Sequence, residues 1–331
     1  MKIGLFSDLH CKVVRKVGYG GYDRRIGEFL DIIDQVFKIF EKEKVDVFFH
    51  LGDLFDSRYS IDVSLLFFLA SFFDTCSVKM KGIFLVGNHE LYYMKKKVNS
   101  IEFLKLKKNY RILNKNEVFR VGNLIVRSVP YKKVWGQEEQ KFIEQGGDIL
   151  LLHQQLAGFP LAINVPSFGT ELVDLSNVKN KYKWIFSGHL HIPQRIDNMV
   201  SVGSVCLHHF GDIGERGCWI LDTDNNDLKF YKLKYPKFID IEKEEEIPNE
   251  FDTYNYYRVY INENSKDLIN RVDKENKGNI EMHIIVNDKP LNRLNISENW
   301  NIFDVMANYV KLLNKDKKYL DFGLKFLNGK K

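Results

Sequence analysis

The sequence predicts an α/β protein whose functional residues lie along one edge of a β-sheet. Two observations support this fold class. Apolar segments of strand length alternate with segments of helical periodicity over the first two-thirds of the chain, and several of these strands end at residues that can bind a metal. Strands of this kind place their carboxyl ends along one sheet edge, so the residues that follow them are expected to lie close together.

The expected elements follow from the spacing of the apolar residues. Between Ile26 and Phe40 these residues recur at helical spacing, which predicts an amphipathic helix. The apolar segment 63–73 predicts a buried helix. Strands are expected at 3–7, 45–51, 82–86, 124–129, 149–152, 184–186, 199–202 and 218–222.

The composition changes near Tyr235, and the charged segment 237–250 is expected to be a linker or a domain boundary. Beyond it, a strand, a helix and a strand predict a small capping unit, and apolar stripes predict two short helices near the end. The expected elements of the unit are 256–261, 266–275 and 280–286. The predicted domains are a core over 1–235, a capping domain over 236–290 and a C-terminal helical segment over 291–331.

Length and composition indicate an ordinary globular protein of about two domains, because the chain has 331 residues, of which 44% are hydrophobic. The net charge of +5 permits nucleic-acid binding without requiring it. The four cysteines form no CxxC pair, so reduced thiols and a cytoplasmic location are expected. Neither a signal region nor a membrane-spanning run is recognisable, so no membrane association is expected.

Residues that can bind a metal occur in five clusters, each after a predicted strand. Each cluster is a weak signal alone, but their order along the chain predicts one shared metal site. Asp8 and His10 are two positions apart on a segment expected to be extended, so both side chains should emerge on the same side; the same holds for His189 and His191. The seven donors are Asp8, His10, Asp53, Asn88, His153, His189 and His191, and His89 stands beside Asn88 in the third cluster. Oxygen and imidazole donors in this number suit two divalent metals and the hydrolysis of a phosphate ester.

These motifs resemble the calcineurin-like metallophosphoesterase family, over residues 1 to about 235. GDLFDSR, GNHE, LLHQ and SGHLH are similar to the SbcD-type DNA repair nucleases, including the recombination endonuclease subunits of T-even-type phages. The segment FGDIGERGCWILD, which follows VGS, is similar to the segment those nucleases carry after their last metal motif. The resemblance implies a four-layer α-β-β-α sandwich of two mixed sheets, with a small α+β capping domain and C-terminal helices.

The resemblance also implies which residues hold which metal, with Asp53 bridging. One metal would be held by Asp8, His10, Asp53 and His191, and the other by Asp53, Asn88, His153 and His189. His89 matches the family's catalytic histidine, which is not a ligand and stabilises the transition state or protonates the leaving oxygen. Glu90 stands where an aspartate is commoner, and keeps a supporting carboxylate. The donor set favours manganese or magnesium, and the resemblance points to manganese.

Other candidate residues have competing interpretations. Asp56 either supports the ligands or caps the following helix. His208 and His209 either line the cleft or are ordinary loop residues, and the second interpretation is favoured. His50 is expected in the core or behind the ligands, and His283 in the sheet of the capping domain.

The resemblance implies a DNA nuclease subunit with 3′–5′ exonuclease and single-strand endonuclease activity, working as a homodimer with an SbcC-like SMC-type ATPase. The C-terminal helices either bind this ATPase or pack on the chain's own capping domain. The expected partner-binding residues are Phe303, Met306, Val310, Leu313 and Leu320, and the expected DNA-binding residues are Arg15, Lys16 and Arg58, whose alternative is a solvated surface. A small-molecule phosphatase or cyclic-nucleotide phosphodiesterase and a non-catalytic scaffold are the alternative functions.

Overall fold

The computed structural model describes residues 1–13, 24–91, 99–160, 172–276 and 278–285. The chain divides into two compact units. The first comprises residues 1–240, 248–258 and 275–281, and it contains every residue of the predicted metal site. The second comprises 241–247, 259–274 and the chain from 282 onward.

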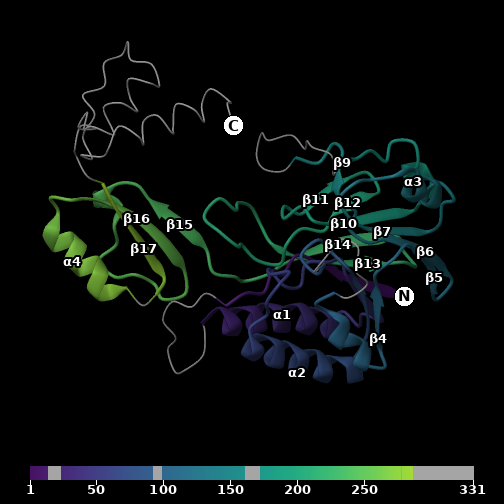
Figure 1. Cartoon of the computed structure of the whole chain (residues 1–331), viewed down its shortest axis with the longest axis horizontal. Coiled ribbons are helices and arrows are strands. Elements are labelled where there is room, and N and C mark those ends of the chain that lie inside the picture. The colour runs from purple at the N-terminus through teal and green to yellow at the C-terminus, as the bar shows by residue number, and fades with distance from the viewer. Residues whose placement is uncertain (14–23, 92–98, 161–171, 277, 286–331) are drawn as a thin grey trace, which may run out of the picture. The chain divides into compact units, whose positions relative to one another are not determined.

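The first of two large sheets is built mainly from parallel strands (Figure 1). Its order is β14 (Asp227–Lys232), β13 (Gly217–Asp222), β1 (Lys2–Phe6), β2 (Val47–His50), β3 (Lys81–Leu85) and β4 (Tyr110–Leu113). Strands β1 to β4 are parallel, whereas β13 runs antiparallel to β1, with Ile3 opposite Leu221. Because β1 lies inside the sheet, both of its edges are paired.

The second large sheet is also mixed. Its order is β11 (Gln194–Ile196), β12 (Met199–Ser201), β10 (Trp184–Gly188), β7 (Ile149–His153), β6 (Leu124–Val129) and β5 (Glu117–Val121). The four inner strands are parallel and the two edge strands are antiparallel to their neighbours. Two short strands, β8 (Gln155–Leu156) and β9 (Leu172–Val173), pair separately.

The side chains of the sheets alternate between cores, as the period of two in a strand requires. Ile3 and Leu5 of β1 belong to a buried cluster that includes Ile149 and Leu151 of β7, so this cluster lies between the sheets. Phe6 faces the opposite way and belongs to the cluster formed with the helices. A further cluster covers the other face of the second sheet.

Helices α1 (Arg24–Lys42) and α2 (Val63–Lys79) lie side by side and cover the outer face of the first sheet (Figure 1). The outer face of the second sheet is covered by the short helix α3 (Gln137–Ile143) and by loops. The predicted four-layer order is therefore confirmed, with a thin layer on this second side.

Helix α2 begins at the N-cap Asp62, whose carboxylate accepts hydrogen bonds from the amides of Ser64 (2.8 Å) and Leu65 (3.3 Å). The prediction of a buried helix holds for one face of α2 only. Leu65 is buried, but Val63 and Phe67 on the opposite face are 79% and 64% exposed. Apolar composition alone could not show which face of the helix lacks a neighbour.

The capping region contains a three-stranded sheet in the order β15 (Phe238–Ile241), β16 (Tyr256–Asn262) and β17 (Ile280–Ile285), with helix α4 (Lys266–Glu275) between the last two strands. Strand β15 lies within the segment expected to be a linker, whose charged residues concealed a short strand. Turns of 3-10 helix occur at Glu102–Leu106, Lys179–Lys181 and Glu244–Glu246. Among the described residues, no helix is both long and apolar enough to cross a bilayer.

Candidate metal centre

The loops that follow β1 and β2 are joined directly to each other. The amide of Asp8 donates to the carbonyl of Gly52 (3.0 Å), and the amide of His10 donates to the carbonyl of Asp53 (3.0 Å). The loop after β10 joins them, because the amide of His189 lies 3.1 Å from both carboxylate oxygens of Asp8. Residues almost two hundred positions apart therefore meet at the carboxyl ends of the strands, as the sequence predicted.

The backbone that presents these side chains is not the extended chain that was expected. Asp8, His10, Asp53 and His189 all adopt positive φ angles of 52°, 46°, 58° and 79°. Left-handed backbone is unfavourable for residues other than glycine, and it persists where the surrounding structure dictates it. The side chains converge because each loop turns sharply, and alternation along a strand is not the cause.

The half-site of the second predicted metal, called the second half-site below, is formed by Asp53, Asn88, His153 and His189. The Nε2 atom of His153 lies 3.3 Å from Asp53 Oδ2 and 3.0 Å from Asn88 Oδ1. The Nδ1 atom of His189 lies 3.1 Å from the same Asn88 oxygen. Single donor atoms of Asp53, His153 and His189 all lie within 4.8 Å of one another, so the structure brings together the set predicted for the second metal.

The half-site of the first predicted metal, called the first half-site below, is formed around His10. Its Nε2 atom lies 3.2 Å from His191 Nε2, 3.6 Å from Asp53 Oδ2 and 3.8 Å from Asp8 Oδ1. The structure therefore also brings together the set predicted for the first metal. Asp53 Oδ2 is the atom near both half-sites, which is the position that a bridging carboxylate would occupy.

Glycine residues leave no room for a larger side chain between these loops. A Cβ atom on Gly87 would lie 2.2 Å from Asp53 Oδ1, and one on Gly188 would lie 2.8 Å from His153 Nδ1. Gly52 combines such crowding with a positive φ of 101°. These glycines are required by close approach of the chain around the ligands, and not by turn geometry alone.

Glu90 fastens the loops after β2 and β3 to each other. Its fully buried carboxylate accepts hydrogen bonds from the amides of Gly87 (2.7 Å), Asp53 (2.8 Å) and Leu54 (2.6 Å). Burial and the nearby Asp53 carboxylate raise the pKa of Glu90 to about 7. The carboxylate supports the ligands without facing the half-sites, as the sequence predicted.

His89 lies at the edge of the first half-site. Its amide donates to Asp53 Oδ1 (2.9 Å), and its ring lies 4.7 Å from that of His10. Its Nδ1 atom lies 2.5 Å from the carbonyl oxygen of Asp56. Because a carbonyl only accepts, Nδ1 carries the hydrogen and Nε2 is the atom left for a substrate.

Asp56 supports this region and does not cap α2, whose N-cap is Asp62. Its carboxylate lies 3.6 Å from His10 Nδ1 and 3.4 Å from the ammonium group of Lys12. Burial would raise the pKa of Asp56, but His10 and Lys12 lower it to about 2. Asp56 is therefore ionised at neutral pH and holds the far side of the His10 ring.

His208 is the site residue that sequence reasoning placed incorrectly. It was favoured as an ordinary loop residue, but it is buried, and its ring lies 5.0 Å from the rings of both His10 and His191. Its neighbour His209 is exposed, as expected. Asp212, which the sequence did not single out, accepts the amide of His208 (2.7 Å) and lies 3.9 Å from His191 Nδ1. No motif spacing marks either residue.

The pKa values of the two histidines in the second half-site show that the Asp53 carboxylate favours a positive charge next to it. Burial would lower the pKa of His153, but the Asp53 carboxylate raises it to about 10. Both ring nitrogens then face acceptors, because Nδ1 lies 2.5 Å from the carbonyl of Leu51. Burial and the neighbouring His153 lower the pKa of His189 to about 3. In the metal-free chain, a proton on His153 thus occupies the place of positive charge beside Asp53.

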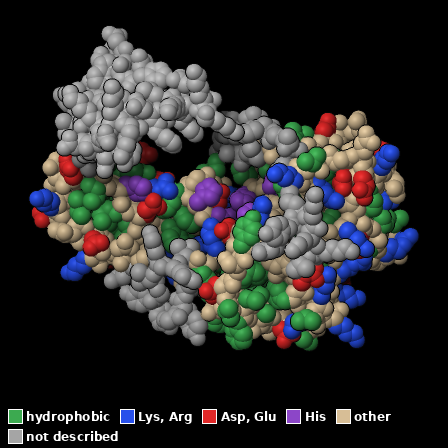
Figure 2. Space-filling model, in the orientation of Figure 1, with side chains coloured by type: hydrophobic (Ala, Val, Ile, Leu, Met, Phe, Trp, Pro, Cys, Tyr) green, Lys and Arg blue, Asp and Glu red, His purple; other side chains and the backbone are tan. Residues whose placement is uncertain are grey.

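These residues fit a pair of divalent cations. The donors are carboxylate and amide oxygens with imidazole nitrogens, which suit metals such as manganese, iron and zinc. Five of them (Asp8, His10, Asp53, Asn88 and His153) are buried, whereas His189 and His191 are partly exposed. Backbone hydrogen bonds and the crowding by glycines hold the site in place, so it is preorganised. Figure 2 shows several histidine side chains gathered in one patch of the surface. A substrate could therefore reach the centre.

The remaining predicted residues lie elsewhere. Arg58 is half-buried, on the loop between Asp53 and α2. Two further DNA-binding candidates, Arg15 and Lys16, lie outside the described residues. So do the partner-binding candidates Phe303, Met306, Val310, Leu313 and Leu320.

Two histidines are placed as the sequence predicted. His50 is buried, with its ring 4.9 Å from that of Phe6 and 5.6 Å from that of Phe84. It therefore packs in the core next to the metal turn. His283 lies in β17, in the sheet of the capping region.

Fold and site together define a metal-dependent phosphoesterase, and comparison with known proteins agrees. The family model of calcineurin-like phosphoesterases matches residues 1–193, which is more than half of the chain. The chain therefore belongs to the calcineurin-like phosphoesterase family, whose members are hydrolases with a dinuclear divalent metal centre.

Individual relatives are distant. Exonuclease subunit 1 of Enterobacteria phage T4 is 24% identical over 211 residues, covering 61% of this chain and 60% of the phage protein. A protein of Invertebrate iridescent virus 6 named as a phosphoesterase is 21% identical over 245 residues, covering 65% of this chain and 83% of the viral protein. The match therefore spans less than two-thirds of the T4 exonuclease subunit.

Solved structures with similarity to this chain include an archaeal phosphodiesterase, with 14% identity, a TM-score of 0.38 and coverage of 70% of this chain and 100% of that one. They also include a dimetal phosphatase from Danio rerio, with 12% identity, a TM-score of 0.37 and coverage of 66% and 91%.

Proposed function

We propose that the chain is the nuclease subunit of an SbcCD-like repair and recombination complex, a 3′–5′ exonuclease and single-strand endonuclease that hydrolyses DNA phosphodiester bonds. The observation that carries the chemistry is the convergence on Asp53 Oδ2 of His153 Nε2 (3.3 Å) and His10 Nε2 (3.6 Å), which come from different sheets. The similarity to the T4 exonuclease subunit supports DNA as the substrate.

The residues divide the work between holding metals and moving a proton. Two divalent cations, manganese in preference to magnesium, would activate a water and offset charge on the phosphate. Asp8, His10 and His191 hold one with Asp53, and Asn88, His153 and His189 hold the other with it. The Asp56 carbonyl fixes the tautomer of His89, so its Nε2 atom is directed to the phosphate or the leaving oxygen.

The test compares manganese-dependent hydrolysis of linear duplex DNA with that of bis(p-nitrophenyl) phosphate and a cyclic nucleotide. His89→Asn should lower kcat by about 10²–10⁴-fold while both metals still bind, because it removes a proton-transfer group and no ligand. His209→Asn is the matched control, an exposed histidine of the same region, and should leave kcat unchanged.

Three outcomes would contradict separate parts of the proposal. Full-rate DNA cleavage by His89→Asn would overturn the role of His89. Turnover of the small phosphoesters without any cleavage of DNA would overturn the substrate and favour the small-molecule alternative. A chain that binds both metals but hydrolyses none of these substrates would favour the scaffold alternative.

A small phosphoester is the second candidate substrate, because a cavity of about 360 Å³ lies next to Asp56, whose carboxylate is 3.6 Å from His10 Nδ1. Its walls include Asp56, Lys12, Phe55 and Ser57. A pocket of this size fits a ligand of about one nucleotide. The same cavity could hold the terminal nucleotide of a DNA strand, so the substrate comparison above decides between the two.

The proposed complex needs three further contacts. The exposed apolar side chains Val63 and Phe67 of α2 favour a homodimer through this helix. The C-terminal segment 291–331 is proposed to bind the SMC-type ATPase, and co-purification of that ATPase with the full chain but not with a chain lacking 291–331 would support this. Arg58, Arg15 and Lys16 are proposed to contact DNA phosphates.

Cytoplasmic location is supported by the four cysteines, all of which are free.

A further inference from the structure

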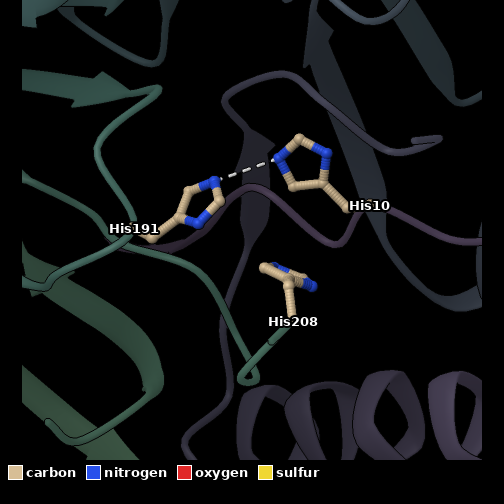
Figure 3. A group of neighbouring side chains, drawn as sticks. All are labelled: His10, His191 and His208. Carbon is tan, nitrogen blue, oxygen red and sulfur yellow. Dashed lines mark hydrogen bonds between the residues drawn. The ribbon is translucent and has the colours of Figure 1, made fainter. Parts of the chain in front are cut away.

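His208 reaches the first half-site from a segment that supplies none of the expected ligands. The segment runs from β12 to β13, whereas His10 follows β1 and His191 follows β10. Figure 3 shows the three imidazoles grouped around one space. One ring nitrogen from each of the three lies within 4.8 Å of the other two. The half-site therefore has a third imidazole within reach.

The orientation of His208 leaves one nitrogen with a lone pair. Its Nε2 atom lies 3.0 Å from the backbone carbonyl of Asp8, so Nε2 carries the hydrogen and donates it. Its Nδ1 atom is buried and has no hydrogen-bond partner in the described part of the chain. Because donor atoms of His10 and His191 lie within 4.8 Å of a His208 ring nitrogen, coordination of a shared metal would give this buried imidazole a further partner.

Contacts of the backbone around His208 also help to fix the position of its ring. The amide of His208 donates to Asp212 Oδ2 (2.7 Å), and Ser204 at the start of the segment bridges to Ser7 at the end of β1. Together with the bond to Asp8, these contacts tie the segment to the loop that carries the first ligands. His208 is thus preorganised beside the first half-site. Phe210 and Gly211, further along the same segment, have no donor side chain and could not take its place.

We propose that His208 is an additional imidazole ligand of the metal held by His10 and His191, and that it raises the affinity of this half-site for zinc more than its affinity for manganese. Imidazole donors suit zinc, whereas carboxylate and carbonyl oxygens suit manganese. The other half-site contains the amide oxygen of Asn88, and His208 should leave its metal affinities unchanged. This inference rests on the proposed two-metal centre but not on DNA as the substrate.

The experiment titrates Zn²⁺ and Mn²⁺ separately into metal-free, full-length protein by calorimetry. His208→Phe keeps a planar ring and removes both nitrogens. His208→Gln places an amide donor near the position of Nε2, so it can keep the bond to the Asp8 carbonyl while the imidazole is lost. His209→Gln is the matched control. Circular dichroism establishes that each variant is folded.

Both His208 variants should bind Zn²⁺ at one site about tenfold or more weakly, with Mn²⁺ affinity changed less than about threefold. The visible spectrum of bound Co²⁺ should change in both variants and stay unchanged in His209→Gln. Wild-type Zn²⁺ affinity in His208→Gln would overturn the proposal, because His208 would then act only through Asp8. These binding measurements use no substrate, so a failure to cleave DNA would leave their result intact.

Discussion

Gly87→Ala should damage both the fold and the metal centre, because the added methyl group has no space. Its Cβ atom would lie 2.2 Å from Asp53 Oδ1 and 2.7 Å from the Asp53 amide nitrogen, where ordinary contacts begin at 3.4 Å. The Asp53 loop or the end of β3 must therefore move by about 1 Å, which costs roughly 1–3 kcal/mol as overpacking. The bond from the His89 amide to Asp53 Oδ1 (2.9 Å) would be lost, at about 1–3 kcal/mol.

The expected loss in the free energy of unfolding is therefore about 2–6 kcal/mol, measured by urea denaturation of the metal-free protein. Calorimetry should also show both metals binding at least about tenfold more weakly, because Asp53 faces both half-sites. Gly27→Ala is the matched control. Gly27 is exposed in α1 with nothing within 4 Å of its Cβ position, so alanine there should stabilise the helix by about 0.5–1 kcal/mol. Equal stability and metal affinity of Gly87→Ala and the wild type would refute the reasoning.

Two further predictions concern buried histidines. His50→Leu should raise the free energy of unfolding by about 1 kcal/mol at pH 7.5, because both ring nitrogens of His50 are buried without a hydrogen-bond partner among the described residues. Burial lowers its pKa from 6.5 to about 3, so the unfolded chain takes up a proton that the folded chain excludes, and wild-type stability is lost as pH falls below 6.5. The gain from His50→Leu should therefore grow by about 1.4 kcal/mol per pH unit below 6.5, and urea denaturation giving an equal gain at pH 7.5 and 5.5 would argue against this burial cost. Mn²⁺ binding at pH 7.5 should release a proton from His153, whose pKa of about 10 means that its stabilising proton is lost only as pH rises toward that value. Calorimetry in two buffers of different ionisation enthalpy would detect the release, and a buffer-independent heat would contradict it.

The sequence predicted the alternating strands and helices and the clusters of ligand residues because both depend on short-range patterns, whereas the four-layer order was implied by the family resemblance. Strands such as β2 and β7 are continuous apolar runs, and the ligands follow them directly. Strand β15 was missed because its charged surroundings hide the alternation. The left-handed backbone at Asp8 and His10 was also missed, since both residues would favour ordinary conformations alone and are held by bonds to the loop of Asp53.

His208 shows a different limit of sequence analysis. It lies beyond the last metal motif, and nothing in its spacing from His191 distinguishes it from the exposed His209 beside it. Only the bond to the Asp8 carbonyl and the approach of the two other rings separate them. Such information depends on how β12 and β13 are connected in space.

The pairing of β1 with β13 has a consequence for biosynthesis. Residue Lys2 lies opposite Asp222, so one edge of the first strand stays open until the ribosome has released more than two hundred further residues. An open apolar edge invites pairing with other nascent chains. Chaperone protection of the nascent chain until residue 217 has emerged should therefore raise the yield of active protein.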